Sequence, residues 1–132
     1  MSSPQVKYHS PAELFEPTGP WSIVAEAGPL VFLAGLRGLD PVTSRLLDDP
    51  LERTRQIFIN MQLAARSVGL DLHAVMRLTV FVTDMKAHRP LVNQVQREFW
   101  GDGPYPPRTI VEVSGLNQDD FVEVEATLYR PV

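Results

Sequence analysis

FVEVEATLYR, residues 121–130, is the most informative local feature of the sequence. Polar and apolar residues alternate along it, which predicts a β-strand with two different faces. One face carries Phe121, Glu123, Glu125, Thr127 and Tyr129, and the other carries Val122, Val124, Ala126 and Leu128. The negative charges of Glu123 and Glu125 repel each other unless a nearby cation or solvent compensates them. Two interpretations stay open: the face is simply wet, or it borders a cleft between subunits where one glutamate orients water or moves a proton.

Six further elements are expected upstream of this strand. Four strands are predicted at residues 21–27, 30–35, 75–83 and 108–113, and two helices at residues 50–68 and 85–100. Asp49 and Asp84 are suitable N-cap residues, and Pro50 fits the first helical position. Gly69 and Gly101 are natural helix ends, because glycine readily adopts the left-handed conformation found there.

The predicted order is β-β-α-β-α-β-β in one α+β domain that spans residues 1–132, with a loosely ordered arm at residues 1–18. The strand at 75–83 is apolar on both faces, which favours burial on both sides. The turn-like residues 117–120 predict an antiparallel hairpin of the last two strands. Two helices packed on a mixed sheet cover only one face, so the other face needs a partner and a homo-oligomer is expected.

Composition argues against several classes of protein. The 132 residues carry a net charge of −4 and no basic run, so neither a nucleic-acid nor a membrane partner is expected. The absence of cysteine excludes disulfides, thiolate catalysis and iron–sulfur clusters. No apolar run is long enough to span a bilayer, and residues 1–10 lack the apolar region of a signal peptide. We therefore expect a cytoplasmic protein.

The remaining side chains offer few conventional catalytic groups. The three histidines are scattered without metal-ligand spacing, so no metal site is expected, and no serine stands in a nucleophile elbow. Lys7 and Lys86 are the only lysines, and neither suits a Schiff base. Arg108 follows Pro106 and Pro107, whose rings stiffen the backbone before it. A restrained backbone suits a guanidinium that binds a carboxylate. An ordinary ion pair with a strand glutamate explains Arg108 equally well.

Short motifs along the chain add up to a family resemblance. They are Gly19-Pro20, Val31-Phe32 with Gly35, Asp40-Pro41 with Thr43, Arg55-Gln56 with Asn60, Gly69-Leu70, Thr79-Val80-Phe81 with Asp84, Val92-Asn93 with Phe99, Pro107-Arg108-Thr109, and Val122-Glu123-Val124-Glu125-Ala126. With these motifs in this order and spacing, the chain resembles the RidA/YjgF family of imine and enamine deaminases over nearly its whole length.

The resemblance implies a chorismate-mutase-like fold and a homotrimeric barrel, with the sheets facing inward and clefts between subunits. It also implies that 2-imino acids, or their enamine tautomers, are hydrolysed to 2-oxo acids and ammonia without a cofactor. By the same resemblance, the catalytic residues are Arg108, which holds the substrate carboxylate, and Glu123, which orients the water. The substrate-binding positions are then Arg108, Trp21, Ala34, Asn93 and Ile110, of which Asn93 has a supporting role.

This chain departs from the family where polar residues are usual near the pocket. Trp21 stands in place of a tyrosine, Ala34 in place of a serine and Leu36 in place of a glutamine, while Arg53 also replaces a glutamine. The loss of three polar groups favours a larger or more apolar imine or enamine acid, such as a 2-aminomuconate-type ring-cleavage product.

Two functions other than deamination stay open. A non-catalytic trimer could bind a small carboxylate metabolite at Arg108 as a sensor or scaffold, and it would not need Glu123. RNA cleavage is suggested by the ribonuclease names of some relatives. The net charge and the missing basic groove argue against RNA cleavage.

Overall fold

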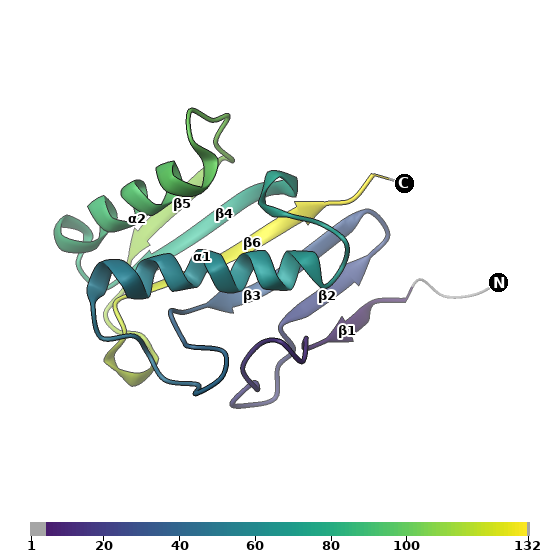
Figure 1. The fold of residues 1–132 in the computed structure, drawn as a ribbon, viewed down its shortest axis with the longest axis horizontal. Helices are drawn as coiled ribbons and strands as arrows, with labels where there is room; N and C mark the ends of the chain where they lie inside the picture. Colours follow the sequence, from purple (N-terminus) through teal and green to yellow (C-terminus); the bar gives the residue numbers. More distant parts are fainter. Residues whose placement is uncertain (1–4, 132) are drawn as a thin grey trace.

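A six-stranded sheet forms the centre of the computed structural model, which describes residues 5–131 (Figure 1). Its strands are β1 (Lys7–His9), β2 (Val24–Ala27), β3 (Leu30–Leu36), β4 (Val75–Val82), β5 (Arg108–Glu112) and β6 (Val122–Tyr129). The helices are α1 (Pro50–Arg66) and α2 (Met85–Trp100), and two 3₁₀ turns are η1 (Leu72–Ala74) and η2 (Asn117–Asp119). The strand order across the sheet is β1-β2-β3-β6-β4-β5. The β4–β5 pair is parallel and the other neighbouring pairs are antiparallel.

Both helices begin at the predicted caps. The Asp49 carboxylate accepts a hydrogen bond from the Glu52 amide at 2.9 Å, and the Asp84 carboxylate accepts one from the Ala87 amide at 3.1 Å. These bonds satisfy N–H groups that have no partner inside the helix. Gly101 follows α2 with a φ of 57°, a conformation that glycine adopts without strain. Local sequence therefore sets the helix boundaries.

The two helices pack side by side on one face of the sheet, α1 over β3 and β6 and α2 beside β4 (Figure 1). The strand face that they cover is the predicted apolar face of β6, whose members Val122, Val124, Ala126 and Leu128 are all buried. This arrangement confirms an α+β fold with a mixed sheet and two helices on one face. Because β6 pairs with both β3 and β4, it lies near the middle of the sheet and joins its two halves.

Two predicted details of the sheet are wrong. The last two strands do not form a hairpin, since β5 pairs in parallel with β4 and β6 lies on the other side of β4. Nor is β4 buried on both sides: Leu78 and Val80 are fully buried, whereas Met76 is 46% exposed and Phe81 is half-buried. Turn-like residues suit a connection that crosses a strand as well as a tight hairpin. Local pattern does not identify the partner strand.

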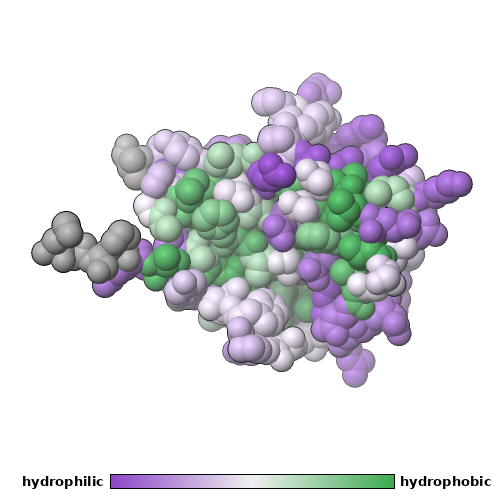
Figure 2. All heavy atoms as spheres, turned by 180° about the vertical axis from the view of Figure 1, so that it is seen from behind, coloured by the Kyte–Doolittle hydropathy of each residue, from purple (hydrophilic) through white to green (hydrophobic). Residues whose placement is uncertain are grey.

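The face of the sheet opposite the helices is open (Figure 2). Four large side chains exposed on it are Tyr8, Phe32, Val111 and Tyr129. Figure 2 shows hydrophobic groups on this face between polar ones. A sheet face that the two helices leave uncovered is the feature from which the sequence predicts an oligomer. The trimeric barrel stays a prediction.

Residues 5–18 do not form the loosely ordered arm that the sequence predicts. Lys7–His9 pairs antiparallel with β2 as strand β1, and Leu14 and Phe15 are buried, with exposed fractions of 6% and 4%. Burial of these two apolar side chains orders a segment whose prolines hide any periodicity. Residues 1–4 of the predicted arm lie outside the described residues.

Candidate functional site

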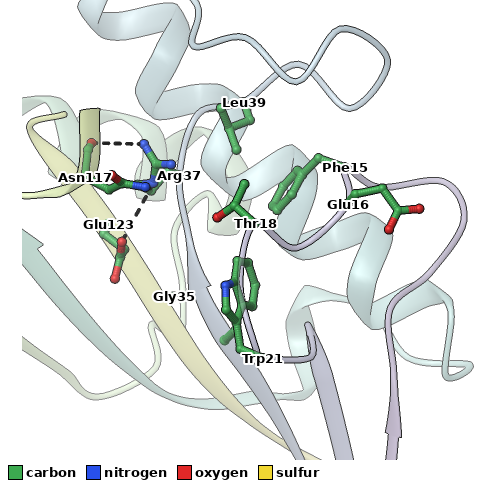
Figure 3. A pocket seen from close by; sticks show the side chains of 10 residues that line it. Phe15, Glu16, Thr18, Trp21, Gly35, Arg37, Leu39, Asn117 and Glu123 are labelled. Atoms are coloured by element: carbon green, nitrogen blue, oxygen red, sulfur yellow. Dashed lines mark hydrogen bonds and ion pairs between the residues drawn. The ribbon is translucent and has the colours of Figure 1, made fainter. Parts of the chain in front are cut away.

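A cavity of about 340 Å³ lies between the N-terminal segment and one end of β3 and β6 (Figure 3). Figure 3 shows Arg37 and Glu123 on one side of it and Phe15, Thr18 and Trp21 on the other. The residues that line it are Phe15, Glu16, Thr18, Trp21, Ala34, Gly35, Arg37, Leu39, Asn117 and Glu123. Aromatic and aliphatic walls with a few converging charged groups are typical of a small-molecule site.

The Glu123 side chain crosses directly over Gly35 of the neighbouring strand. A Cβ atom at position 35 would lie 2.4 Å from Oε2 of Glu123, closer than any non-bonded contact allows. The β3–β6 register also shifts between Leu33 and Leu36, which bends β3 at this point. Gly35 is therefore the residue that gives the Glu123 carboxylate its room in the cavity.

Burial changes the acidity of Glu123. The side chain is 29% exposed, and its partial removal from water raises the pKa of the carboxyl group above its ordinary value. The Arg37 guanidinium lowers the pKa, whereas the negative charges of Asp120 and Glu125 raise it further. A carboxyl group whose pKa moves toward neutrality is suited to accepting and returning a proton.

Arg37, directly after β3, is a site residue that the sequence analysis missed. Arg37 is only 8% exposed, and its Nε lies 3.9 Å from Oε1 of Glu123. The sequence offered one signal of tight packing here, the two glycines Gly35 and Gly38 on either side of Arg37. Gly35 leaves room for Glu123, and a Cβ at Gly38 would lie 2.2 Å from the Arg53 carbonyl oxygen. Periodicity contains no information about such an arginine.

A buried carboxylate stands behind this pair. Asp120 is 1% exposed and accepts hydrogen bonds from Arg37 at 3.1 Å and from Arg53 at 3.2 Å. The Arg53 guanidinium also lies over the Phe121 ring, 4.7 Å from its centroid. Arg53, which stands in place of a glutamine usual in the family, is thus a counter-ion for Asp120.

Arg108 belongs to a second cavity, of about 320 Å³, at the β5 edge of the sheet. Its Nη1 donates to Oδ1 of Asn93 and to Oε1 of Gln96, both at 2.7 Å. Burial and the positive charge of Arg89 lower the pKa of the Arg108 guanidinium, yet an arginine stays cationic at any ordinary pH. Two amide oxygens from α2 thus hold the group without neutralising it.

Arg108 and Glu123 lie on opposite faces of the sheet within one chain. Arg108 is in register with Leu78 of β4, which points to the helices, whereas Glu123 is in register with Phe81, which points to the open face. Side chains on neighbouring strands point to the same face when they are in register. One copy of the chain therefore does not bring the two predicted catalytic residues together.

Among residues 5–131, no three histidine, aspartate or glutamate side chains group closely enough to hold a metal ion. In the same part of the chain, neither helix has the length and apolar character that crossing a bilayer requires.

Comparison with known protein families identifies the family of the chain. The family model described as endoribonuclease L-PSP matches residues 12–129. This is the model of the RidA/YjgF/RutC proteins. The chain belongs to the RidA/YjgF family. The resemblance derived from the sequence motifs is thereby confirmed.

Relatives within the RidA/YjgF family carry several names. A RutC family protein of Pyrococcus horikoshii is 34% identical over 87% of this chain and 90% of its own length. A protein of Dermatophagoides farinae named 2-iminobutanoate/2-iminopropanoate deaminase is 29% identical over 84% of this chain and 86% of its own.

Two solved structures confirm the fold. A probable translation initiation inhibitor from Rhodopseudomonas palustris superimposes with a TM-score of 0.92 at 44% identity and covers 97% of this chain and 100% of its own. RidA from an Antarctic Psychrobacter gives 0.87 at 27% identity and covers 93% of this chain and 98% of its own. The α+β architecture is thus that of the RidA/YjgF family.

The structure divides the predicted site residues into two groups. Trp21 and Ala34 line the cavity that contains Glu123, and Asn93 contacts Arg108. Ile110, two residues after Arg108, packs against the core on the same side of β5. Leu36 does not belong to the group of pocket residues in which the sequence analysis put it. Leu36 is fully buried in the core and does not line the cavity. Its presence in place of the family's glutamine therefore does not make the cavity wall more apolar.

Proposed function

We propose that the protein is a cofactor-independent deaminase that hydrolyses 2-imino acids or their enamine tautomers to 2-oxo acids and ammonia. The observation that carries the proposal is the half-buried Glu123 carboxylate at the wall of a small-molecule cavity, in a member of the RidA/YjgF family. A relative named for deamination of 2-iminobutanoate and 2-iminopropanoate supports the reaction class.

The reaction needs little more than a placed carboxyl group and water. Water adds to the imine carbon while Glu123 accepts one of its protons, and a C–O bond replaces the C=N π bond. Glu123 returns the proton to the nitrogen, which gives a carbinolamine. Glu123 then moves the remaining hydroxyl proton to the amino group as the C=O bond forms and the C–N bond breaks, and ammonia leaves a 2-oxo acid. One water is consumed, nothing is oxidised or reduced, and the carboxylate is regenerated. A raised pKa favours both halves of this proton transfer.

Arg108 completes the proposed site from a neighbouring subunit of a homotrimer. Within one chain its cavity lies at the β5 edge and on the other face of the sheet from Glu123. A second copy packed against the open face would cover exposed Phe32 and Tyr129. It would also allow its Arg108 to bind the carboxylate of a substrate whose imine carbon faces Glu123.

The walls of the Glu123 cavity support a substrate with a bulky, apolar side chain. Phe15, Trp21, Ala34 and Leu39 contribute carbon surface, and Trp21 is 39% exposed. Apolar walls of this kind favour large side chains because they gain affinity by burying carbon atoms. A 2-aminomuconate-type enamine acid is the largest candidate that we propose.

The deciding experiment generates imino acids in the assay with an amino-acid oxidase and follows imine decay and ammonia release. The substrates should range from alanine-derived to leucine- and phenylalanine-derived imines and include 2-aminomuconate. We expect acceleration of imine decay, with larger kcat/KM for the bulkier imines. If no imine decays faster than in buffer, the proposed deaminase activity is wrong.

A matched pair of glutamates tests the site. Glu123→Gln keeps the shape of the side chain but removes the base, and we expect kcat/KM to fall by about 10²- to 10⁴-fold. Glu125→Gln, two residues along the same face and outside the cavity, removes a carboxylate that acts on Glu123 only through its charge, so we expect a far smaller change in rate than in Glu123→Gln. Equal loss in both variants would contradict a specific role for Glu123.

A small-carboxylate sensor is the second candidate, because the Arg108 cavity holds a positive charge between neutral amides. This function would require Arg108 but not Glu123. Calorimetric titration with 2-oxo acids separates the two functions. Tight binding that survives Glu123→Gln, without any turnover by the wild type, would favour the sensor.

A further inference from the structure

Arg37 is held in one position by a loop from the far end of the chain. Its Nη1 donates to the Asn117 carbonyl oxygen at 3.2 Å and to Asp120 Oδ2 at 3.1 Å, and its Nη2 donates to Gln118 Oε1 at 3.0 Å. Gln118 adopts a φ of 58°, so the loop turns back sharply around the guanidinium. A side chain with three such bonds and little exposure keeps one rotamer.

The backbone of Arg37 is fixed as well. The buried side-chain amide of Asn60 on α1 donates to the carbonyl oxygens of Arg37 at 3.1 Å and of Leu39 at 2.9 Å. Helix α1 thereby ties down the chain just beyond β3. Both ends of the Arg37 side chain are therefore anchored, and the group that faces the cavity is its Nε, 3.9 Å from Glu123 Oε1.

We propose that Arg37 is a positioning residue that holds the Glu123 carboxylate over Gly35, at the cavity wall, as an anion. The proposal rests on the proposed function, since Glu123 is the acid–base group of that reaction. In Figure 3 the dashed line joins Arg37 to one oxygen of the Glu123 carboxylate, which is Oε1. This contact leaves the other oxygen, Oε2, for water and substrate.

The charges around Glu123 explain why it needs such a partner. Asp120 from the loop before β6 and Glu125 from its own strand are both negative and raise its pKa, in the same direction as burial. Glu16 lines the far side of the cavity, and its carboxylate points away from Glu123 (Figure 3). Arg37 is the positive group that opposes them. Without Arg37, Glu123 would hold its proton to a higher pH, and a smaller fraction of it would be ionised and able to act as a base.

The test measures the ionisation of Glu123 directly, without substrate. The side-chain carboxyl carbons of glutamate are labelled with carbon-13 and titrated by NMR, and Glu123→Gln identifies the resonance. In Arg37→Gln we expect Glu123 to titrate at higher pH than in the wild type. Arg37→Lys, which restores the charge, should move the titration back toward the wild-type value. The acid limb of the imine hydrolysis profile should move in the same direction in each variant.

Arg53→Gln is the matched control, because Arg53 binds the same Asp120 carboxylate but does not contact Glu123. In Arg53→Gln, the Glu123 carboxyl group should titrate at the same pH as in the wild type. Where Arg37→Gln fails to fold, the double variant Arg37→Gln/Asp120→Asn removes both charges of the buried pair. Its Glu123 should then titrate at higher pH than in Asp120→Asn alone.

The possible outcomes separate the two proposals. An unchanged Glu123 titration in folded Arg37→Gln, or in the double variant against its single parent, would overturn the positioning role even if the protein is an active deaminase. A shifted titration in a protein that hydrolyses no imine supports the positioning role and removes the proposed reaction. A shift of equal size in Arg53→Gln would show that net charge acts, not the contact with Arg37, and would also overturn the positioning role.

Discussion

Two arginines, Arg37 directly after β3 and Arg108 at the start of β5, use their guanidinium groups in different ways. Arg37 donates three bonds to the loop 117–120 and turns its Nε to Glu123. Arg108 donates both of its hydrogen bonds from Nη1, to Asn93 and Gln96. Among residues 5–131, its Nε and Nη2 have no hydrogen-bond acceptor. A guanidinium has five N–H donors; Arg37 uses three of them in hydrogen bonds and turns its Nε to Glu123, whereas Arg108 uses two.

This difference separates a group that builds a site from a group that receives a ligand. Arg37 and its counter-ion Asp120 form a closed pair, 8% and 1% exposed, whose neighbours supply every partner. Arg108 is held by neutral amides, and its positive charge has no carboxylate within hydrogen-bond distance in the described chain. A pre-oriented cation with free donors is suited to a carboxylate arriving from outside.

The first prediction concerns stability, where the closed region should be far more sensitive. Asp120→Ala leaves Arg37 and Arg53 without their shared carboxylate in a buried position, and we expect a loss of about 3–5 kcal/mol in the free energy of unfolding. Arg108→Ala removes a partly exposed cation whose partners are neutral, and it should destabilise by less than about 1.5 kcal/mol. Urea unfolding followed by fluorescence of the two tryptophans measures both.

Asp120→Asn is the intermediate case for the same measurement. It keeps one oxygen that accepts from one of the two arginines and turns an amide NH2 toward the other, so its loss should lie between the other two. Equal stability of Asp120→Ala and Arg108→Ala would show that the loop 117–120 does not close around Arg37 in solution. The contrast between the two arginines would then disappear.

The second prediction tests the room that Gly35 gives to Glu123. In Gly35→Ala the added Cβ displaces the carboxylate, and we expect kcat/KM for imines to fall by about 10²-fold because misplacement of roughly 1 Å has effects of this size. Gly115→Ala is the control, since nothing lies within 4 Å of a Cβ there. Steady-state kinetics of both variants on one bulky imine decide the question. Full activity of Gly35→Ala would mean that Glu123 works from another rotamer.

The third prediction concerns the receiving arginine. Arg108→Gln should raise KM for an imino acid by roughly 10- to 100-fold, since a charge-assisted bond to a carboxylate is worth about 1.5–3 kcal/mol. Asn93→Ala should raise KM less, because it removes the support and leaves the cation. A change in kcat alone, with KM unaltered in both variants, would show that Arg108 does not hold the substrate carboxylate.

Sequence reasoning succeeded where the information is local. The alternation of residues 121–130, the caps Asp49 and Asp84 and the motif spacing predicted the strand, both helices and the family. The partner of β5 was beyond local pattern, because a parallel neighbour and a hairpin need the same apolar run and the same turn residues. Burial of Leu14 and Phe15 likewise depends on the rest of the fold.

The candidate site shows the same division. Glu123 and Arg108 followed from motif and residue type, but their location on opposite faces depends on the order β6-β4-β5. Arg37 left no pattern, because a buried arginine is defined by the carboxylate that pairs with it, 83 residues further along the chain.

The last and smallest effect is a pH dependence of stability with opposite signs in two regions. Glu123 has a folded-state pKa above its ordinary value of 4.5, so the folded protein loses stability as pH rises from 4.5 through that raised value. Glu123→Gln should therefore be slightly more stable than the wild type at pH 7, with the difference vanishing below 4.5. The Arg130 guanidinium lowers the pKa of Glu26, so Glu26→Gln should be less stable at pH 7, and its deficit should disappear as pH falls through the lowered pKa. Thermal unfolding of both variants from pH 3.5 to 8 measures the two signs. If Glu123→Gln were instead less stable than the wild type at neutral pH, the carboxylate would be a stabilising ion-pair partner like Glu26, not a desolvated group kept ready for proton transfer.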